Sequence, residues 1–332
     1  MAARPDALAV YATERKHHCR RAVTTHRVKI ERIVSFANAK VRLEFLAMER
    51  SLRATGCDLP LLVIPFDDNL FELPKNAEWW RDEVLFSALT KNGAVPHCRK
   101  FTAFLNSNSA FFDSDIIHLL NPVKWLDPLP QDVFVVADTE WSKARWTFTP
   151  ETKALYQDKT TLWLLDNFNS GFFAFSKPPA STSDISRLMQ HPNLANIAKG
   201  ASPTRSEQEG ANFLLHESGM DILNLCLPPH RMESTMACDY PDDYGPLLRK
   251  ANSPAFVHYA GVGRNRDRPV TQLIYEHLTK AETAEMRAEF EHGRERARWQ
   301  SHWPLWVRVV KRIIPYLDRR FCIQWNDSRQ SV

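Results

Sequence analysis

The sequence KFTAFLNSNSAFFDSDIIHLL spans residues 100–120 and places two carboxylates inside an otherwise apolar run. Asp113 and Asp115 follow Ala110-Phe111-Phe112 and precede Ile116-Ile117. A short apolar run of this kind is typical of a strand that is buried on both faces. Because burying an unpaired charge is costly, we expect the two acids at a strand end that faces a cleft. With one residue between them, both acids can reach one hard cation, and an acidic loop turn is the alternative.

The composition is that of a globular protein. The 332 residues are 44% hydrophobic and 25% charged, which suffices for one large core or two smaller domains. The net charge of +4 favours an anionic ligand over a nucleic-acid partner. The six cysteines are scattered and form no Cys-x-x-Cys pair, a pattern that favours reduced thiols in a cytosolic protein. We expect a cytoplasmic protein, because the sequence contains neither an apolar signal segment nor a run of ~18 apolar residues.

Residues 32–65 predict a strand–helix–strand unit. Strands at 32–36 and 61–65 flank a helix at 41–54, in which apolar residues recur at helical spacing. This unit implies a parallel sheet with a right-handed crossover. Ligands of such sheets gather at the carboxyl ends of the strands, where Asn38 and Asp67 lie.

The rest of the chain continues the alternation of strands and helices. The predicted strands are 132–138, 162–165, 172–175 and 255–259, and the predicted helical segments are 74–98, 100–105, 183–198, a segment around 213–215, 271–298 and 303–318. We divide the chain into a basic lead-in (1–28), one α/β domain (29–270) and a helical extension (271–332).

Four separated motifs follow one another along the predicted domain. They are Lys100 with the Asp-Ser-Asp triplet, Asn169-Ser170-Gly171, Glu207-Gln208 with Asn212, and His258-x-x-Gly261-x-x-Arg264. In this order and at these intervals they resemble the retaining glycosyltransferases of family eight, the group that includes glycogenin. The resemblance covers roughly residues 32–270 and implies a GT-A type nucleotide-diphospho-sugar transferase fold, a twisted mixed sheet flanked by helices.

The resemblance implies a metal site made of Asp113, Asp115 and His258. Two carboxylates and one imidazole suit Mn²⁺, with Mg²⁺ as the other choice. In that family the ion bridges the diphosphate of a nucleotide-sugar and neutralises its charge as it leaves. The alternative for His258 is an ordinary core histidine on a strand.

The resemblance also implies donor-binding residues. Lys100, Gly261 and Arg264 would contact the diphosphate, and Asn38 and Asp67 are candidates for the base and the ribose. The family usually has lysine where this chain has Arg264, which keeps the charge but alters its reach. The alternative for Lys100 is an ordinary exposed lysine.

Five residues are expected around the transferred sugar. The resemblance implies that Asp138 holds the sugar and that Asn169 and Ser170 order its hydroxyls. Glu207 and Gln208 would lie next to the anomeric carbon, where family members often show Asp-Gln, and a polar surface pair is the alternative. The implied reaction is front-side transfer with retained configuration, through an oxocarbenium-like state, with the leaving phosphate acting as base.

The sequence therefore predicts a metal-dependent hexosyltransferase that uses a nucleotide-sugar, with UDP as the expected nucleotide, and a glycan, lipid or protein acceptor. A non-catalytic binding protein that keeps the fold is the first alternative, and a nucleotidyltransferase is the second. Gly261-Val262-Gly263 lacks the third glycine of a dinucleotide fingerprint and comes too late in the chain.

The C-terminal segment 303–320 predicts a basic amphipathic helix with tryptophans at one end. Such a helix can lie on an anionic membrane, which would place the protein at the inner membrane face. Its apolar side can equally pack on the domain or on a second copy of the chain in a homo-oligomer.

Overall fold

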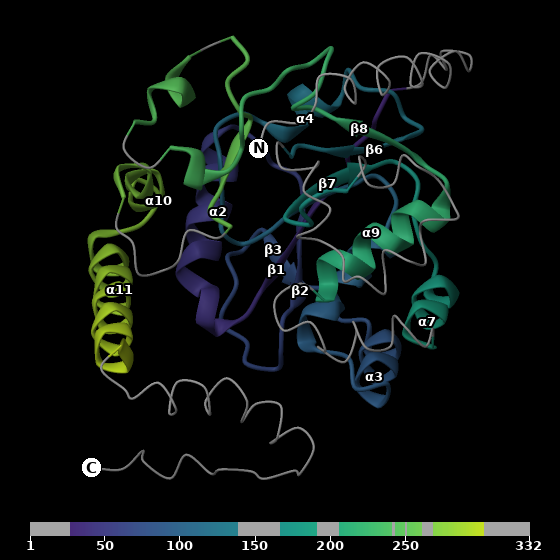
Figure 1. Ribbon diagram of the computed structural model, residues 1–332, viewed down its shortest axis with the longest axis horizontal. Helices are drawn as coiled ribbons and strands as arrows, with labels where there is room; N and C mark the ends of the chain where they lie inside the picture. Colours follow the sequence, from purple (N-terminus) through teal and green to yellow (C-terminus); the bar gives the residue numbers. More distant parts are fainter. Residues whose placement is uncertain are drawn as a thin grey trace. The chain divides into compact units, whose positions relative to one another are not determined.

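The computed structural model describes residues 27–138, 167–190, 206–240, 243–249, 251–260 and 268–301. Its centre is a seven-stranded sheet with helices on both faces (Figure 1). In spatial order the strands are β3 (Ala77–Trp79), β2 (Leu61–Pro65), β1 (Arg32–Ala37), β4 (Ser109–Phe112), β7 (Phe172–Phe175), β6 (Val133–Val136) and β8 (Asp221–Asn224). Strand β7 is antiparallel to both of its neighbours, and the other pairs are parallel. The sheet confirms the predicted α/β architecture, a mixed sheet flanked by helices.

The predicted strand–helix–strand unit is confirmed as β1, α2 (Arg42–Ala54) and β2, with parallel pairing of β1 and β2. The helix forms because Phe45, Met48 and Leu52 repeat on one face, and all three are fully buried. It ends before Gly56, whose φ of 80° is the left-handed conformation that suits glycine after a helix.

The sheet separates two apolar cores. Alternate residues of each strand point to opposite faces, so Phe111 and Phe173 face one core while Phe112 and Phe172 face the other. The helices α3 (Glu83–Lys91), α7 (Thr182–Gln190) and α9 (Ser206–Ser218) cover the first core. Helices α2 and α4 (Pro122–Leu126) cover the second.

A smaller sheet and several 3₁₀ helices complete the domain. Strands β5 (Ile116–His118) and β9 (Phe256–His258) pair antiparallel, so that Ile116 lies opposite His258. The 3₁₀ helices are η1 (Ala39–Val41), η2 (Pro96–Leu105), η3 (Ala237–Asp239), η4 (Gly245–Leu248) and η5 (Pro269–Thr271).

Two predictions of secondary structure need correction. The helix expected over 74–98 is wrong at its start, because 77–79 pair with β2 as an edge strand and α3 begins only after Asp82. The Asp82 carboxylate caps α3 by accepting a hydrogen bond from the Leu85 N–H at 2.9 Å. Strand β8 was not predicted, because its four residues carry little apolar signal.

The helix expected over 271–298 is divided into η5, α10 (Gln272–Tyr275) and α11 (Lys280–Ser301). The described residues form two units, of which the first contains both sheets and the helices through α10, and the second contains α11. The predicted segments 162–165, 191–198 and 303–318 lie outside the described residues.

Candidate functional site

The candidate residues converge on one edge of the large sheet. Asn38, Asp67, Asp113 and Asp138 each follow the carboxyl end of a strand, namely β1, β2, β4 and β6. These strands share one direction, so their carboxyl ends meet at the same edge. Because β7 runs the opposite way, the segment before it, 169–171, reaches the same edge.

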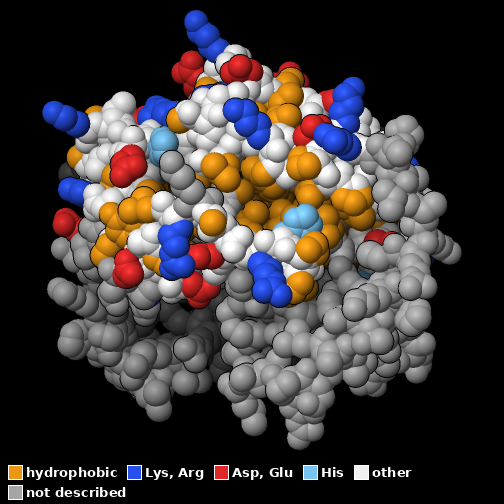
Figure 2. Space-filling model, turned by 90° about the horizontal axis from the view of Figure 1, so that it is seen from above, with side chains coloured by type: hydrophobic (Ala, Val, Ile, Leu, Met, Phe, Trp, Pro, Cys, Tyr) orange, Lys and Arg blue, Asp and Glu red, His pale blue; other side chains and the backbone are white. Residues whose placement is uncertain are grey.

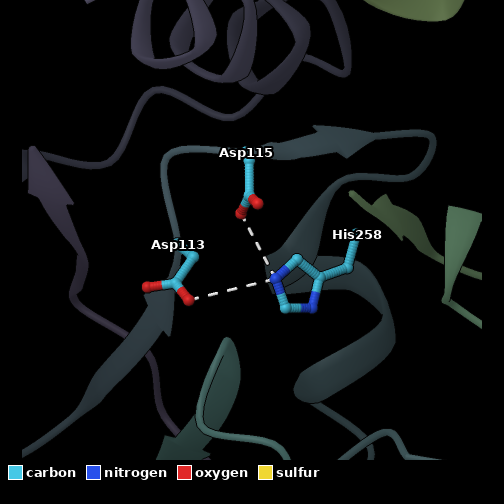
Figure 3. Close-up of side chains that lie close together, drawn as sticks. All are labelled: Asp113, Asp115 and His258. Atoms are coloured by element: carbon cyan, nitrogen blue, oxygen red, sulfur yellow. Dashed lines mark ion pairs between the residues drawn. The ribbon is translucent and has the colours of Figure 1, made fainter. Parts of the chain in front are cut away.

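Asp113, Asp115 and His258 form one cluster at this edge (Figure 3). One ligand atom from each residue lies within 4.8 Å of the other two. His258 Nε2 is 3.2 Å from Asp115 Oδ1 and 3.9 Å from Asp113 Oδ2. The two acids sit in the bend between β4 and β5, and the histidine ends β9, which pairs with β5. The predicted grouping of these three residues is therefore observed.

Backbone hydrogen bonds hold the cluster in place. The Asp113 N–H donates to the Gly171 carbonyl at 2.8 Å, and the Tyr259 N–H donates to the Asp115 carbonyl at 3.0 Å. The His258 N–H donates to the Thr235 carbonyl at 2.7 Å. Each residue of the cluster is thus fixed by its neighbours on a rigid strand or strand end.

Gly171 lies directly against the His258 ring. A methyl group added at Gly171 would stand 2.0 Å from His258 Cε1 and 2.7 Å from its Nε2, distances that real side chains do not tolerate. His258 is 4% exposed, and protein interiors are closely packed, so a shift of the ring would disturb its neighbours. Glycine at position 171 therefore creates the space in which the imidazole stands, a role that the sequence motif alone does not reveal.

Lys100 completes the charge balance of the cluster. Its Nζ lies 2.8 Å from Asp113 Oδ1 and 3.1 Å from Asp113 Oδ2, so one ammonium contacts both carboxylate oxygens. Burial alone would lower the pKa of Lys100, but the charges of Asp113 and Glu207 raise it above the ordinary lysine value. At 5% exposure, Lys100 is not the exposed surface lysine that was the alternative interpretation.

The three potential ligands have perturbed pKa values. Burial raises the pKa of Asp113, and Lys100 partly opposes this effect. Burial also acts to raise the pKa of Asp115, but the adjacent His258 brings it below the ordinary value. For His258, burial acts to lower the pKa, and the charge of Asp115 outweighs it, so the pKa rises. Opposed shifts in neighbouring buried groups are typical of functional sites.

Asp138 and Asn169 are joined by the backbone. The Asn169 N–H donates to Asp138 Oδ2 at 2.7 Å, and the Gly171 N–H donates to Asn169 Oδ1 at 2.9 Å. The Asn224 side chain at the end of β8 pairs with both backbone groups of Asp138, at 3.2 and 2.8 Å. The turn at residues 169–171, just before β7, therefore connects Asp138 at the end of β6 with Asp113 at the end of β4.

Asn212 links that turn to helix α9. It is fully buried, and it accepts from the Phe168 N–H and donates to the Phe168 carbonyl, both at 2.9 Å. Glu207 and Gln208 lie one turn earlier on the same helix, and the Glu207 charge acts on Lys100. Ser170 is buried in the turn. The structure thus brings Asp138, Asn169 and Ser170 to the same edge as the Asp113–Asp115–His258 cluster, and Glu207 lies close enough to act on Lys100.

Asn38 and Asp67 contact each other beside the cluster. Asn38 Nδ2 donates to Asp67 Oδ2 at 2.8 Å, while Asn38 Oδ1 caps η1 by accepting from the Lys40 N–H at 3.0 Å. The two residues are adjacent because β1 and β2 are neighbouring parallel strands. Gly261 and Arg264 lie outside the described residues, as do 141–148 and 303–320.

His97 belongs to the site and was missed by the sequence analysis. Its ring lies edge-on to Phe66, with the ring centroids 4.2 Å apart. Burial lowers the pKa of His97, and the charges of Glu207, Lys100 and Asp113 also act on it. A histidine three residues before a predicted site lysine, on one short helical segment, is the only signal that could have suggested it.

The donor set of the cluster fits a divalent cation. Two carboxylates and an imidazole nitrogen converge within coordination reach of a common point, and hard or borderline ions such as Mg²⁺ and Mn²⁺ accept such ligands. The described cysteines form no disulfide and take no part in this cluster; they are Cys57, Cys98, Cys226 and Cys238.

Two surface findings bear on partners. On the face drawn in Figure 2, basic and acidic side chains are interspersed around hydrophobic ones, and its described residues show no continuous basic strip. Within the described part of the chain, no helix has the length and apolar character needed to cross a bilayer.

Comparison with known proteins finds similarity only among solved structures. No protein-family model matches the sequence, and no curated protein matches it. Solved structures that resemble this chain include the bifunctional glycosyltransferase WbbM, at 12% identity and a TM-score of 0.42 over 80% of this chain and 52% of that one. Apo GlyE of Streptococcus pneumoniae matches at 10% identity and a TM-score of 0.42, over 80% of this chain and 64% of that chain.

The galactosyltransferase LgtC, solved with donor and acceptor sugar analogs, matches at 14% identity and a TM-score of 0.44. That match covers 74% of this chain and 96% of LgtC. Since the chain spans less than two thirds of the first two structures, the activities of those whole proteins do not transfer to it by similarity.

Proposed function

We propose that this protein is a metal-dependent retaining glycosyltransferase that moves a hexose-like sugar from a UDP-sugar to an acceptor. The observation that carries the proposal is the convergence of Asp113, Asp115 and His258 with Asp138 and the turn before β7 at one sheet edge. This edge is where ligands of open α/β sheets bind. An acidic cluster beside a separate group of polar residues suits a donor with a diphosphate at one end and a sugar at the other.

Asp113, Asp115 and His258 would hold Mn²⁺ or Mg²⁺. The ion would supply a Lewis acid that neutralises negative charge developing on the departing diphosphate. Lys100 adds a fixed positive charge on the same side, and its burial strengthens that charge's effect on a nearby phosphate. Gly261 and Arg264 are proposed as further phosphate contacts.

The sugar is proposed to lie over the turn that joins Asp138 to the cluster. Asp138 and Asn169 offer acceptors for sugar hydroxyls, and Ser170 and Gln208 are proposed to complete the polar wall. The anomeric carbon becomes oxocarbenium-like as the phosphate leaves, and the Glu207 carboxylate would stabilise that positive charge. We propose front-side attack with the departing phosphate as base, which retains the configuration.

The nucleotide is proposed to bind at the ends of β1 and β2. Asn38 and Asp67 form a hydrogen-bonded pair there that can rearrange to receive the base and the ribose. The acceptor, which can be a glycan, a lipid or a protein, is left open. The division at about residue 270, a cytoplasmic location, and membrane or homo-oligomer contacts through 303–320 are part of the same proposal.

Calorimetric titration with UDP, with and without Mn²⁺, tests the proposal. We expect Mn²⁺-dependent binding that Asp115→Ala abolishes and Asp221→Ala preserves, because Asp221 begins β8 at the opposite edge of the sheet. Hydrolysis of UDP-sugars by the wild type would then separate an enzyme from a binding protein that merely keeps the fold. Failure of UDP, GDP and ADP to bind with any divalent ion would contradict the proposal.

A further inference from the structure

Lys100 forms an ion pair with Asp113, one of the two carboxylates that a metal ion would need. Its ammonium contacts both oxygens of Asp113, at 2.8 and 3.1 Å, and the side chain is 94% buried. Asp115 by contrast is engaged only on one oxygen among the contacts described, by His258 Nε2 at 3.2 Å. The two carboxylates are therefore unequal, because Asp113 is held on both oxygens by an internal cation and Asp115 is held on one oxygen by a histidine.

The other described contacts of the Lys100 ammonium are with two aromatic rings. The rings of Phe36 and Phe111 lie beneath it, with their centroids 5.7 and 5.2 Å from Nζ. These rings tolerate a cation but cannot replace the hydrogen bonds of a carboxylate. A divalent ion that binds Asp113 must share it with Lys100, and two cations at one carboxylate repel each other in a poorly hydrated site.

We propose that Lys100 couples metal binding to nucleotide binding, a proposal that rests on the proposed function. Without a nucleotide, Lys100 neutralises Asp113 and weakens the cluster's affinity for a divalent ion. When a diphosphate binds, its oxygens give the ammonium a new partner, Lys100 releases Asp113, and the carboxylate becomes available to the ion. Metal and nucleotide therefore strengthen each other's binding by the same factor.

Electron paramagnetic resonance of free Mn²⁺ measures this coupling directly and requires no turnover. The wild type, Lys100→Met and Arg99→Met are titrated with Mn²⁺, each with and without saturating UDP. Arg99 is the matched control, since it is the neighbouring cation but pairs with Asp68 at 3.2 Å rather than with the cluster. Lys100→Gln is a second neutral variant that keeps a polar side chain, and Lys100→Arg keeps the buried positive charge in case its loss prevents folding.

We expect Lys100→Met to bind Mn²⁺ about tenfold more tightly than the wild type without UDP, and to lose most of the enhancement that UDP produces. Lys100→Gln should behave in the same direction, Lys100→Arg should keep the coupling, and Arg99→Met should change either affinity by less than about threefold. Equal or weaker Mn²⁺ binding by folded Lys100→Met and Lys100→Gln would overturn this inference alone. Absence of Mn²⁺ binding by every variant, with and without UDP, would overturn the proposed metal site and this inference together.

Discussion

Two buried histidines lie in the same two-stranded sheet, yet their surroundings differ completely. His118 in β5 and His258 in β9 are 3% and 4% exposed. His258 has carboxylates 3.2 and 3.9 Å from its Nε2, as Figure 3 shows. Neither ring nitrogen of His118 has a hydrogen-bond partner in the described structure, and the ring lies edge-on to Phe112.

Both histidines are buried, so it is the charge of neighbouring side chains that distinguishes the candidate ligand His258 from the core histidine His118. Burial lowers the pKa of His118 to about 3, with smaller contributions from His277 and Arg53. At His258 the same burial is outweighed by Asp115, and the pKa is raised. Polar neighbours make the second imidazole available for chemistry, whereas apolar neighbours confine the first to packing.

Mn²⁺ affinity should change most when a side chain fills the space that Gly171 leaves for the His258 ring. Gly171→Ala places a methyl group 2.0 Å from the ring and should weaken Mn²⁺ binding by about 100-fold, because the ligand must leave its position. Titration calorimetry measures this effect, and thermal unfolding checks that the variant folds.

Gly219→Ala is the matched control for that variant. Its φ of 67° makes alanine unfavourable there, but nothing lies within 4 Å of the added methyl group. We expect a stability loss of about 1 kcal/mol and unchanged Mn²⁺ affinity. Equal affinity in Gly171→Ala and the wild type would show that His258 is not a ligand.

A smaller effect is expected when His258 loses its nearest charge. Asp115→Asn keeps the shape but removes the carboxylate that raises the pKa of His258, so that pKa should fall. Mn²⁺ affinity should fall about 30-fold, since an amide oxygen remains as a weaker ligand. Imidazole NMR titration follows the pKa, and Asp221→Asn serves as the distant control. A His258 pKa that does not move would argue against the observed contact.

His118 should make folding sensitive to acid. Burial lowers the pKa of His118 to about 3 in the folded chain, from an ordinary value of 6.5. Below pH 6.5 the imidazole is therefore protonated in the unfolded chain but stays neutral in the folded chain. This contribution to stability is complete above pH 6.5 and is lost as the pH falls toward 3. Between pH 7 and pH 5 the loss is about 2 kcal/mol.

Urea unfolding at both pH values tests this expectation with His118→Leu. The variant should lose about 2 kcal/mol less than the wild type over that interval, because leucine does not titrate. His216, whose pKa burial lowers to about 4, contributes equally to both proteins. Identical losses in the two proteins would mean that His118 is not held neutral.

A still smaller change concerns packing at Ile116, which lies opposite His258 in the two-stranded sheet. Ile116 pairs with His258 and is fully buried, so Ile116→Val should cost about 1 kcal/mol of folding free energy. Mn²⁺ affinity should not change, because the shorter side chain carries no ligand atom. A loss of affinity comparable with that of Asp115→Asn would instead show that the cluster depends on packing at Ile116.

The sequence correctly predicted helices and strands whose apolar spacing is contained within their own residues. The helix expected at 41–54 and the strand at 61–65 match α2 and β2 because their apolar spacing is set by their own residues. The start of the 74–98 prediction failed because residues 77–79 gain their hydrogen bonds from β2, a partner that periodicity cannot reveal.

The candidate site likewise contains residues that the sequence predicted and contacts that it did not. The motifs named Asp113, Asp115 and His258 as one group, and the structure places them together. His97 and the contact of Gly171 with His258 were not visible, because each depends on a neighbour that folding brings from another part of the chain.

Residue types and spacings along the chain were enough to predict the strand–helix–strand unit and the acidic pair at a strand end. The grouping of His258 with that pair came from the resemblance to a known family. Three contacts became visible only in the folded chain: Lys100 pairs with Asp113, Gly171 makes room for the His258 ring, and the His118 ring is buried without a hydrogen-bond partner among the described residues. Hydrogen bonds and pKa values depend on distance and burial, which are set when separate strands pack together.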